Sequence, residues 1–302
     1  MQKLLLFLTL FLSFQSAFSQ ENPTQEQLIR QVKQLVMLNS ENLNNEAVNL
    51  IAKQILPNRQ HYSSDTIAAL FLLLSDIEIN QGNIEGAYQY VQQGLDTPSQ
   101  NKNIKICLTL KLAQLYIAKK QYNKLFDVAQ RAVFESKQVG NKKKSLLSMS
   151  YRSVALATLG KHKQAFSDLQ AVEKGLTSDK LFDGHIEIFT ILAAAYFQLS
   201  DYQTALTLQL KILKLRFDLQ QKNNIEKTYL SLGYAYFYLQ RFDDAYNAFW
   251  EASHFAEKKL AVFSVAYAQK GLGISLLKQK QYAKSAIALQ QAADIFEQKN
   301  VT

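Results

Sequence analysis

Apolar residues recur along most of the chain at the spacing of an amphipathic helix. The clearest example is a pair of apolar sets with intervals of three and four residues: Tyr229, Leu232 and Tyr236, then Phe242, Ala245, Phe249 and Ala252. Intervals of three and four place side chains on one face of an α-helix. The break between the two sets predicts a short turn, so this stretch is expected to form a helical hairpin.

The same pattern returns about every forty residues. The related segments are NNEAVNLI, NIEGAYQYV, QYNKLFDVA, KHKQAFSDL, DYQTALTLQ, RFDDAYNAF and QYAKSAIAL. Aligned on their second residues, they fall at Asn44, Ile84, Tyr122, His162, Tyr202, Phe242 and Tyr282, so successive spacings are 40 residues except for one of 38. Such a period is typical of a solenoid. Its near-complete coverage of the chain leaves no space for a separate catalytic or DNA-binding domain.

Two positions in each repeat carry mostly small residues, one in each predicted helix. A small residue allows two helix backbones to approach closely, so these positions are predicted to be the packing sites within and between repeats. Those in the first helices are Ala113, Ala193, Gly233 and Gly273, and those in the second helices are Ala87, Ala165, Ala205, Ala245 and Ser285.

Residues 228–252, TYLSLGYAYFYLQRFDDAYNAFWEA, carry a Leu-Gly pair, a tyrosine three residues later, and then Ala, Phe and Ala. This segment resembles the tetratricopeptide repeat family. The resemblance extends well over residues 67–300 and weakly over 26–56. It implies an all-α fold, a right-handed superhelical solenoid of antiparallel helix pairs. The alternating small sites disfavour a heptad coiled coil, the structural alternative.

Two features depart from the family. The period is forty residues rather than about thirty-four, and the proline that often ends the second helix is missing from every repeat. Longer second helices or longer loops are therefore expected, and the fold is expected to be unchanged.

The first residues predict a cleavable signal peptide at 1–19. Lys3 precedes an apolar run from Leu4 to Phe14, and Ala17 and Ser19 provide the small residues of a cleavage site before Gln20. The apolar run is short for an uncleaved membrane anchor, the alternative interpretation. No later stretch is apolar and long enough to span a membrane. We therefore expect an exported protein, periplasmic or secreted, with N-terminal helices and a degenerate first repeat at 20–61 and six hairpins at 62–302.

Composition agrees with long helices. The chain has 3 prolines in 302 residues, and none follows Pro98. Lys and Arg number 34 against 25 Asp and Glu, a formal charge of +9. The lysines, such as Lys142–Lys144, are concentrated in predicted turns beside Asn and Gln. This distribution predicts a solvated rim rather than a nucleic-acid interface.

Few residues suit catalysis or metal binding. The single cysteine, Cys107, rules out a disulfide within the chain; it is predicted to be a helix residue, with an intermolecular disulfide as the alternative. The four histidines lie in different repeats, which argues against a metal site. Nucleophile, zinc-protease and phosphate-loop motifs are missing from the sequence. We expect a non-enzymatic protein without a cofactor.

The family resemblance implies a concave groove lined by the first helix of each repeat, where this family usually receives peptides or protein segments. Aromatic side chains beside lysines favour such an interface. The candidate groove residues are Glu187, Phe197, Lys227, Tyr234, Phe237, Tyr238, Lys270 and Ile274. Further positions are expected on the same face of the first helices when the helical periodicity is followed: Asp76, Ile79, Gln114, Ile117, Val154, Ala157 and Ala194. The alternative is that Tyr234, Phe237 and Tyr238 are ordinary packing residues.

The leading functional hypothesis is a scaffold of the bacterial cell envelope that binds a peptide or partner protein in this groove. The alternative is an extracytoplasmic sensory module of the diguanylate cyclase or histidine kinase type, either stand-alone or truncated at Thr302. Peptide-pheromone receptors have similar repeats but need a cytoplasmic location and an N-terminal helix-turn-helix, for which residues 21–61 are too few. The last helix, about 283–299, carries Ile287 and Ile295, which predict either a homodimer or an outer face made polar by its Lys and Gln residues.

Overall fold

The computed structural model describes residues 27, 30–32, 34, 41–176, 184–221, 223–259 and 261–298. Helices and short turns account for this part of the chain, which contains no strand. None of the helices in the described ranges is long and apolar enough to cross a membrane. The predicted signal peptide at 1–19 lies outside these ranges. The all-α prediction is confirmed.

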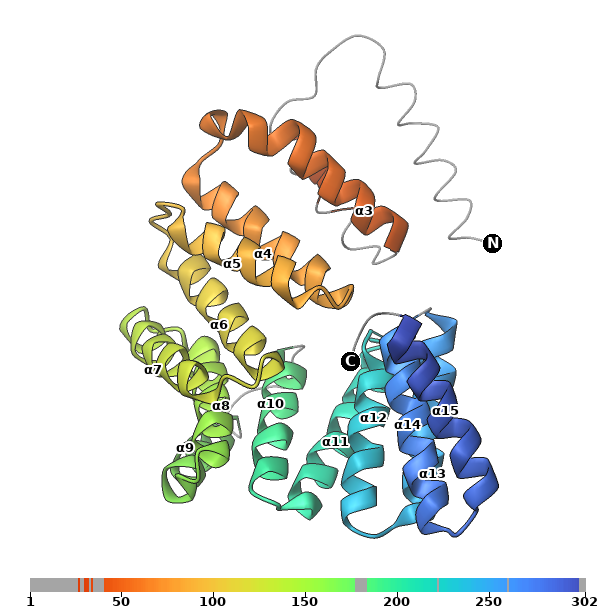
Figure 1. Ribbon diagram of the computed structural model, residues 1–302. Helices are drawn as coiled ribbons and strands as arrows, with labels where there is room; N and C mark the ends of the chain where they lie inside the picture. The colour runs from red at the N-terminus through yellow and green to blue at the C-terminus, as the bar shows by residue number, and fades with distance from the viewer. Residues whose placement is uncertain are drawn as a thin grey trace.

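In the described part of the chain, six antiparallel helix pairs follow a short N-terminal element (Figure 1). That element consists of α3 (Glu41–Leu50), a π-helical turn (Ile51–Ile55) and a 3₁₀ segment (Leu56–His61). The first helices of the pairs are α4 (Ser64–Asn80), α6 (Lys102–Ala118), α8 (Lys142–Thr158), α10 (Gly184–Gln198), α12 (Ile225–Tyr238) and α14 (Val262–Lys278). The second helices are α5 (Ile84–Asp96), α7 (Tyr122–Gln138), α9 (His162–Leu176), α11 (Tyr202–Asp218), α13 (Phe242–Lys258) and α15 (Tyr282–Gln298). The predicted hairpins are thus present in the predicted order.

Helix length explains the forty-residue period. Both α6 and α7 contain 17 residues, and they are separated by a turn at 119–121 and followed by another at 139–141. The second helices α11, α13 and α15 also contain 17 residues each. Of the two possibilities left open by the sequence, longer helices therefore account for most of the extra length.

The turn inside each hairpin contains one residue in the left-handed conformation. These residues recur with the period of the solenoid, and their φ angles are 81° at Gly82, 54° at Lys120, 74° at Gly160, 62° at Ser200, 61° at Gln240 and 62° at Lys280. In the second hairpin, Lys120 N donates to Ile117 O at 3.0 Å and Gln121 N donates to Tyr116 O at 2.9 Å. Such bonds satisfy the last carbonyls of a helix and stop it. The hairpin therefore turns at a fixed point.

Small residues stand where helices meet. A Cβ atom on Gly233 would lie 2.6 Å from the ring of Phe249, and one on Gly273 would lie 2.6 Å from Leu289. Ser285 is buried, and its hydroxyl donates to Gly273 O at 2.8 Å, which joins α15 to α14. The alanines at the equivalent sites are also buried: Ala87, Ala113, Ala165, Ala193, Ala205 and Ala245.

Packing between repeats changes at α10. Elsewhere, each first helix packs mainly on the second helix of the preceding repeat, whereas α10 lies along α8 and hardly touches α9. Val154 of α8 and Ile188 and Leu192 of α10 belong to the same buried cluster. The next first helix, α12, is joined to α10 mainly through α11. The solenoid therefore has one irregular junction near its middle.

Candidate functional site

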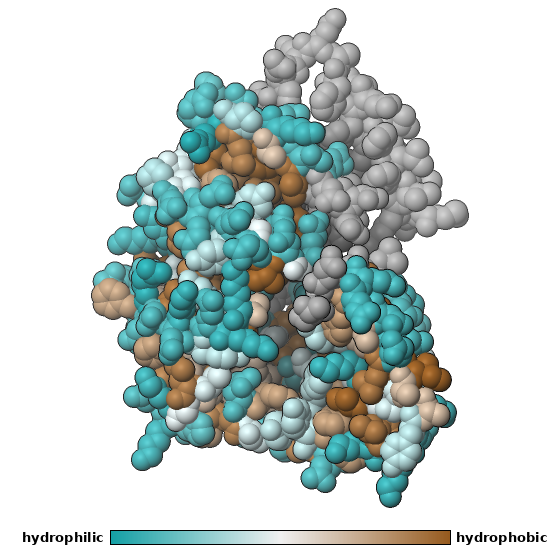
Figure 2. All heavy atoms as spheres, viewed as in Figure 1, coloured by the Kyte–Doolittle hydropathy of each residue, from teal (hydrophilic) through white to brown (hydrophobic). Residues whose placement is uncertain are grey.

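The predicted groove positions lie on the first helices α4 to α14, and together we call them the row of groove positions. Figure 2 shows a hollow near the middle of the molecule, between its N-terminal and C-terminal repeats. Glu187, Lys227 and Lys270 are exposed, whereas Asp76 and Gln114 are half-buried. Charged groups along this row therefore remain within reach of a ligand.

The N-terminal part of the row is a polar wall. Asp76 Oδ1 of α4 lies 2.5 Å from Lys111 Nζ of α6, and the same ammonium donates to Gln114 Oε1 at 3.0 Å. The buried ring of Tyr151 belongs to α8, and its pKa is raised by burial and further by the charges of Glu187 and Asp76. Side chains from four first helices thus act on one another across the wall.

Glu187 combines solvent access with partial desolvation. Its side chain is exposed, yet surrounding protein atoms desolvate the carboxylate and raise its pKa; Asp76 adds to this rise, while Lys111 and Lys143 oppose it. The Glu187 carboxylate is therefore accessible while protein atoms surround part of it.

Lys227 has the opposite charge and a similar environment. It is exposed, while desolvation lowers its pKa, the nearby Glu226 raises it, and Lys259 and Arg216 lower it further. The Glu226 carboxylate is buried and pairs with Lys259 Nζ at 2.9 Å. Arg216 Nε donates to Thr228 Oγ1 at 3.0 Å, which holds this cation at the start of α12. Lys227 therefore belongs to a mainly cationic cluster.

Three of the predicted groove aromatics gather at the hairpin turns. The Phe197 ring lies 5.1 Å from Tyr202 and 5.2 Å from Tyr238, and the Tyr202 and Tyr238 rings stack at 4.8 Å. Phe237 lies 5.5 Å from Phe242. The Phe197–Tyr238 contact joins the ends of two first helices, α10 and α12, and each of the other contacts joins the end of a first helix to the start of a second helix. Tyr238 remains 50% exposed and is the most accessible of the three candidates.

The remaining candidates have different surroundings. The Tyr234 ring packs edge-on against buried Phe249 at 5.0 Å, and burial raises the pKa of its hydroxyl. Ile274 is half-buried. Tyr234 therefore contributes to helix packing and is half-buried.

Two projected groove positions are wrong. Val154 and Ala157 are 2% and 3% exposed, so neither lines an accessible surface. The reason is the irregular junction, since α10 lies along α8 and covers this face. Sequence reasoning also missed Lys111 and Tyr202. The helical phase places Lys111 beside Gln114 on α6, and this spacing was the available signal.

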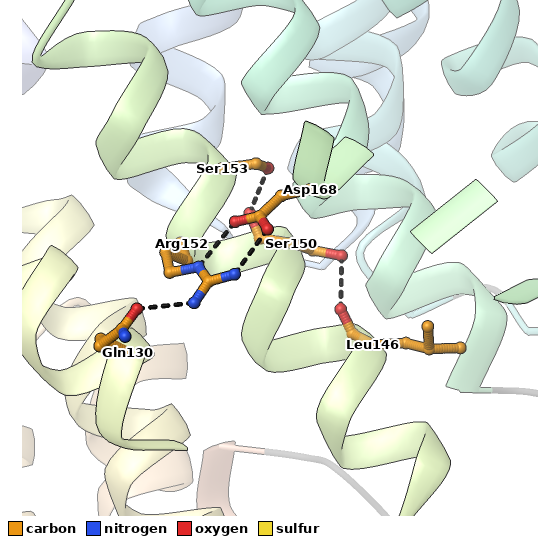
Figure 3. A network of polar contacts seen from close by, with 6 residues as sticks. All are labelled: Gln130, Leu146, Ser150, Arg152, Ser153 and Asp168. Atoms are coloured by element: carbon orange, nitrogen blue, oxygen red, sulfur yellow. Dashed lines mark hydrogen bonds and ion pairs between the residues drawn. The ribbon is translucent and has the colours of Figure 1, made fainter. Parts of the chain in front are cut away.

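The strongest polar network elsewhere is structural. Arg152 Nε and Nη2 donate to the two carboxylate oxygens of Asp168 at 2.7 and 2.6 Å, and Nη1 donates to Gln130 Oε1 at 2.6 Å (Figure 3). These residues tie together α8, α9 and α7. Within the described ranges there is no group of three or more His, Cys, Asp or Glu side chains that could hold a metal ion. Cys107 is half-buried, and its intermolecular disulfide remains a prediction.

Solved structures of helical repeat proteins are similar to this chain. A Rap protein complexed with Competence and Sporulation Factor has a TM-score of 0.62 at 13% identity, with 89% of this chain and 73% of that chain covered. NprR in complex with its cognate peptide NprX has a TM-score of 0.56 at 15% identity, with 91% and 79% covered.

A third similar structure names the repeat type. It is a signal transduction ATPase with a tetratricopeptide repeat sensor from Pyrococcus horikoshii, with a TM-score of 0.50 at 14% identity, and the match covers 91% of this chain and 47% of that chain. No family model matches the sequence, and neither does any curated protein. Together with the forty-residue helical hairpins, these likenesses show that the chain has the tetratricopeptide-repeat type of solenoid fold.

Proposed function

We propose that this protein is a non-enzymatic scaffold that binds a peptide or a segment of a partner protein on the inner surface formed by its first helices. The proposal rests mainly on two accessible, partly desolvated charged side chains, Glu187 on α10 and Lys227 on α12, together with Tyr238 at the adjoining turns. Charges and aromatic rings of this kind give a surface both specificity and contact area. Rap and NprR, whose solved complexes contain Competence and Sporulation Factor and the cognate peptide NprX respectively, support the proposal through their fold alone.

The proposed location is the cell envelope or the medium, because residues 1–19 have the pattern of a signal peptide. Expression of the full chain with a C-terminal tag, followed by fractionation and N-terminal sequencing, tests this location. Export requires a mature protein beginning near Gln20. A cytoplasmic protein that retains Met1–Ser19 would contradict the proposed location.

Binding itself is tested by crosslinking the tagged chain in its native envelope and identifying the crosslinked peptides by mass spectrometry. We expect crosslinks from a benzoylphenylalanine at Tyr238 and none above background from the same group at exposed Phe134 of α7. Equal crosslinking at both positions would contradict binding on the inner surface.

A sensory role is the second candidate, favoured by the likeness to a protein with a tetratricopeptide repeat sensor. In this case the partner is an envelope-bound kinase or cyclase on which the scaffold acts in trans. Copurification of such an enzyme with the tagged chain, with output that changes when the chain is deleted, would favour this role over a passive scaffold.

Self-association through α15 is proposed as a further property. Ile287 is 61% exposed and Tyr282 is 63% exposed, whereas Ile295 is half-buried. Light scattering of the wild type and of Ile287→Lys tests it. A dimer that dissociates in the variant supports the interface, and a monomeric wild type contradicts it.

A further inference from the structure

Glu187 and Lys227 occupy equivalent positions in neighbouring repeats. Each stands six residues before the small packing site of its helix, Ala193 in α10 and Gly233 in α12, so the two differ by one period of forty residues. Both lie in the first turn of their helix and are exposed. Opposite charges are thus presented at the same level of the solenoid.

The surroundings of Glu187 leave its charge available. Asp76 is already paired with Lys111 at 2.5 Å, and that ammonium also donates to Gln114. Lys111 and Lys143 act on Glu187 through space, and the Glu187 carboxylate makes no ion pair or hydrogen bond with another described side chain. A partly desolvated carboxylate without a close partner is a favourable place for a cation from outside.

The surroundings of Lys227 are mainly cationic. Arg216, Lys227 and Lys259 lie around a single carboxylate, Glu226, and this carboxylate pairs with Lys259. Among the described residues Lys227 makes no ion pair with an acidic side chain, while its like-charged neighbours favour an added negative charge. We call these two exposed groups of opposite charge, the Glu187 carboxylate and the Lys227 ammonium, the two poles.

We propose that the inner surface binds a peptide segment carrying two opposite charges, with the cationic group against Glu187 and the anionic group against Lys227. This inference rests on the proposed peptide-binding function and adds the chemistry and orientation of the ligand. Each ligand charge supplies the partner that the solenoid does not provide, and the order of the charges fixes the direction of the peptide.

The helices also set the spacing of the ligand charges. Helices in direct contact have axes about 8 to 10 Å apart, and α10 and α12 are joined mainly through α11 rather than by direct contact. The axes of α10 and α12 are therefore expected to lie at least roughly 10 Å apart at the level of Glu187 and Lys227, although the Phe197 and Tyr238 rings at the other ends of these helices contact each other at 5.2 Å. An extended chain advances about 3.3 Å per residue, so the two ligand charges are expected at least about three residues apart.

The test uses fluorescein-labelled decapeptides with blocked ends and a background of Ala, Ser and Tyr. One series carries Lys and Glu at separations of about one to seven residues in both orders, and the reference peptides carry Lys only, Glu only or neither. Fluorescence anisotropy with the full chain measures Kd at low and high salt. We expect the best oppositely charged peptide to bind about tenfold more tightly than the uncharged one at low salt, at a separation of three residues or more, and less so at high salt.

The variants assign each pole. Glu187→Gln should abolish the gain in affinity that a lysine gives to the peptide and keep the gain that a glutamate gives. Lys227→Gln should abolish the gain from the peptide glutamate and keep the gain from the peptide lysine. Glu187→Lys combined with Lys227→Glu should reverse the preferred order of the charges. Glu297→Gln on α15 and Lys214→Gln on α11, both at exposed positions, are matched controls that should leave every Kd within about twofold. Circular dichroism verifies that each variant is folded.

Different failures have different meanings. Binding that is independent of peptide charge, or reduced equally by the control variants, would overturn the two-pole inference and leave the proposed peptide-binding function standing. If the wild-type chain binds none of the peptides at millimolar concentration, this result would contradict both the two-pole inference and the proposed peptide-binding function.

Discussion

Single polar residues fix helices of different repeats in place, and the Arg152–Asp168 pair has the largest expected effect. The Asp168 side chain is 8% exposed and that of Arg152 is 19% exposed, and two parallel hydrogen bonds join them (Figure 3). A buried charge that loses its partner costs far more than the intact pair contributes, because it stays desolvated without compensation. Removal of one member should therefore be more harmful than replacement of both.

We predict that Asp168→Ala lowers the free energy of unfolding by about 3 kcal/mol. Replacement of both residues by apolar ones, Arg152→Met with Asp168→Leu, should recover most of this loss. Urea denaturation followed by circular dichroism measures both values. A loss below about 1 kcal/mol in Asp168→Ala would show that the pair is too hydrated to matter.

Asp65 supplies the clearest pH dependence of stability. Its Oδ1 accepts hydrogen bonds from Ser99 Oγ at 2.6 Å and from the backbone N–H groups of Gln100 and Asn101 at 3.1 and 3.3 Å. The Ser99 hydrogen bond is the main cause that lowers the pKa of this carboxyl, and the backbone bonds and Lys105 act in the same direction against desolvation. The bonds join the start of α4 to the loop before α6.

The sign of the pH effect follows from the lowered pKa. The carboxylate stabilises the fold above the ordinary aspartate pKa of about 3.9, and this contribution is lost as the pH falls through the lower folded pKa. We predict that Asp65→Asn lowers the thermal midpoint at pH 7, and that the wild type and the variant converge in acid. If the thermal midpoints of the wild type and Asp65→Asn differ by the same amount at pH 2 as at pH 7, the prediction is wrong.

Helix pairs owe their geometry to the turn between them. A residue in the left-handed conformation ends the first helix of every hairpin. This residue is glycine in the first and third hairpins, at Gly82 and Gly160, and another amino acid in the other four. Non-glycine residues pay an energetic penalty in this conformation, and Lys, Ser and Gln occupy it elsewhere. Repeated backbone hydrogen bonds at the turn hold those residues in place.

Exchange of glycine and non-glycine residues at this turn should have opposite effects. We predict that Gly160→Ala lowers the free energy of unfolding by about 1 kcal/mol, since a Cβ there meets no atom within 4 Å and only the backbone is strained. Ser200→Gly should raise stability by less than about 1 kcal/mol, because glycine relieves the strain but adds freedom to the unfolded chain. Chemical denaturation measures both. Gly160→Asn, which tolerates this conformation better, is the control and should lie between wild type and Gly160→Ala.

The helices and their pairing were predictable because packing inside a repeat is local and recurs. Gly233 faces Phe249 within one hairpin, so the small and large residues appear at a fixed distance in the sequence and return every forty residues. Candidate groove residues were only partly predictable. The rotation between repeats decides which side of a first helix stays open, and no local pattern revealed that α10 covers Val154 and Ala157. The Asp76–Lys111 pair likewise depends on contact between two repeats.

The whole molecule is a linear array in which repeats contact mainly their neighbours. The junction at α10 differs from the other junctions of this array, because α9 hardly touches α10 and coupling passes mainly through the α8–α10 contact. Leu192 lies fully buried in α10, in the same cluster as Val154 of α8. Leu276 of α14 is buried in a separate cluster near the C-terminus.

We predict that Leu192→Ala costs about 2 to 5 kcal/mol and also divides unfolding into two steps, as the repeats on the two sides of the junction lose their coupling. Differential scanning calorimetry should show two transitions in place of one, and hydrogen exchange should assign the first to one side of α10. Leu276→Ala removes a buried leucine of the same size away from the junction. This control variant should lower the protection of backbone amides from hydrogen exchange mainly in α14 and α15. If Leu192→Ala unfolds in a single transition like the wild type, coupling across the solenoid does not depend on the α8–α10 contact.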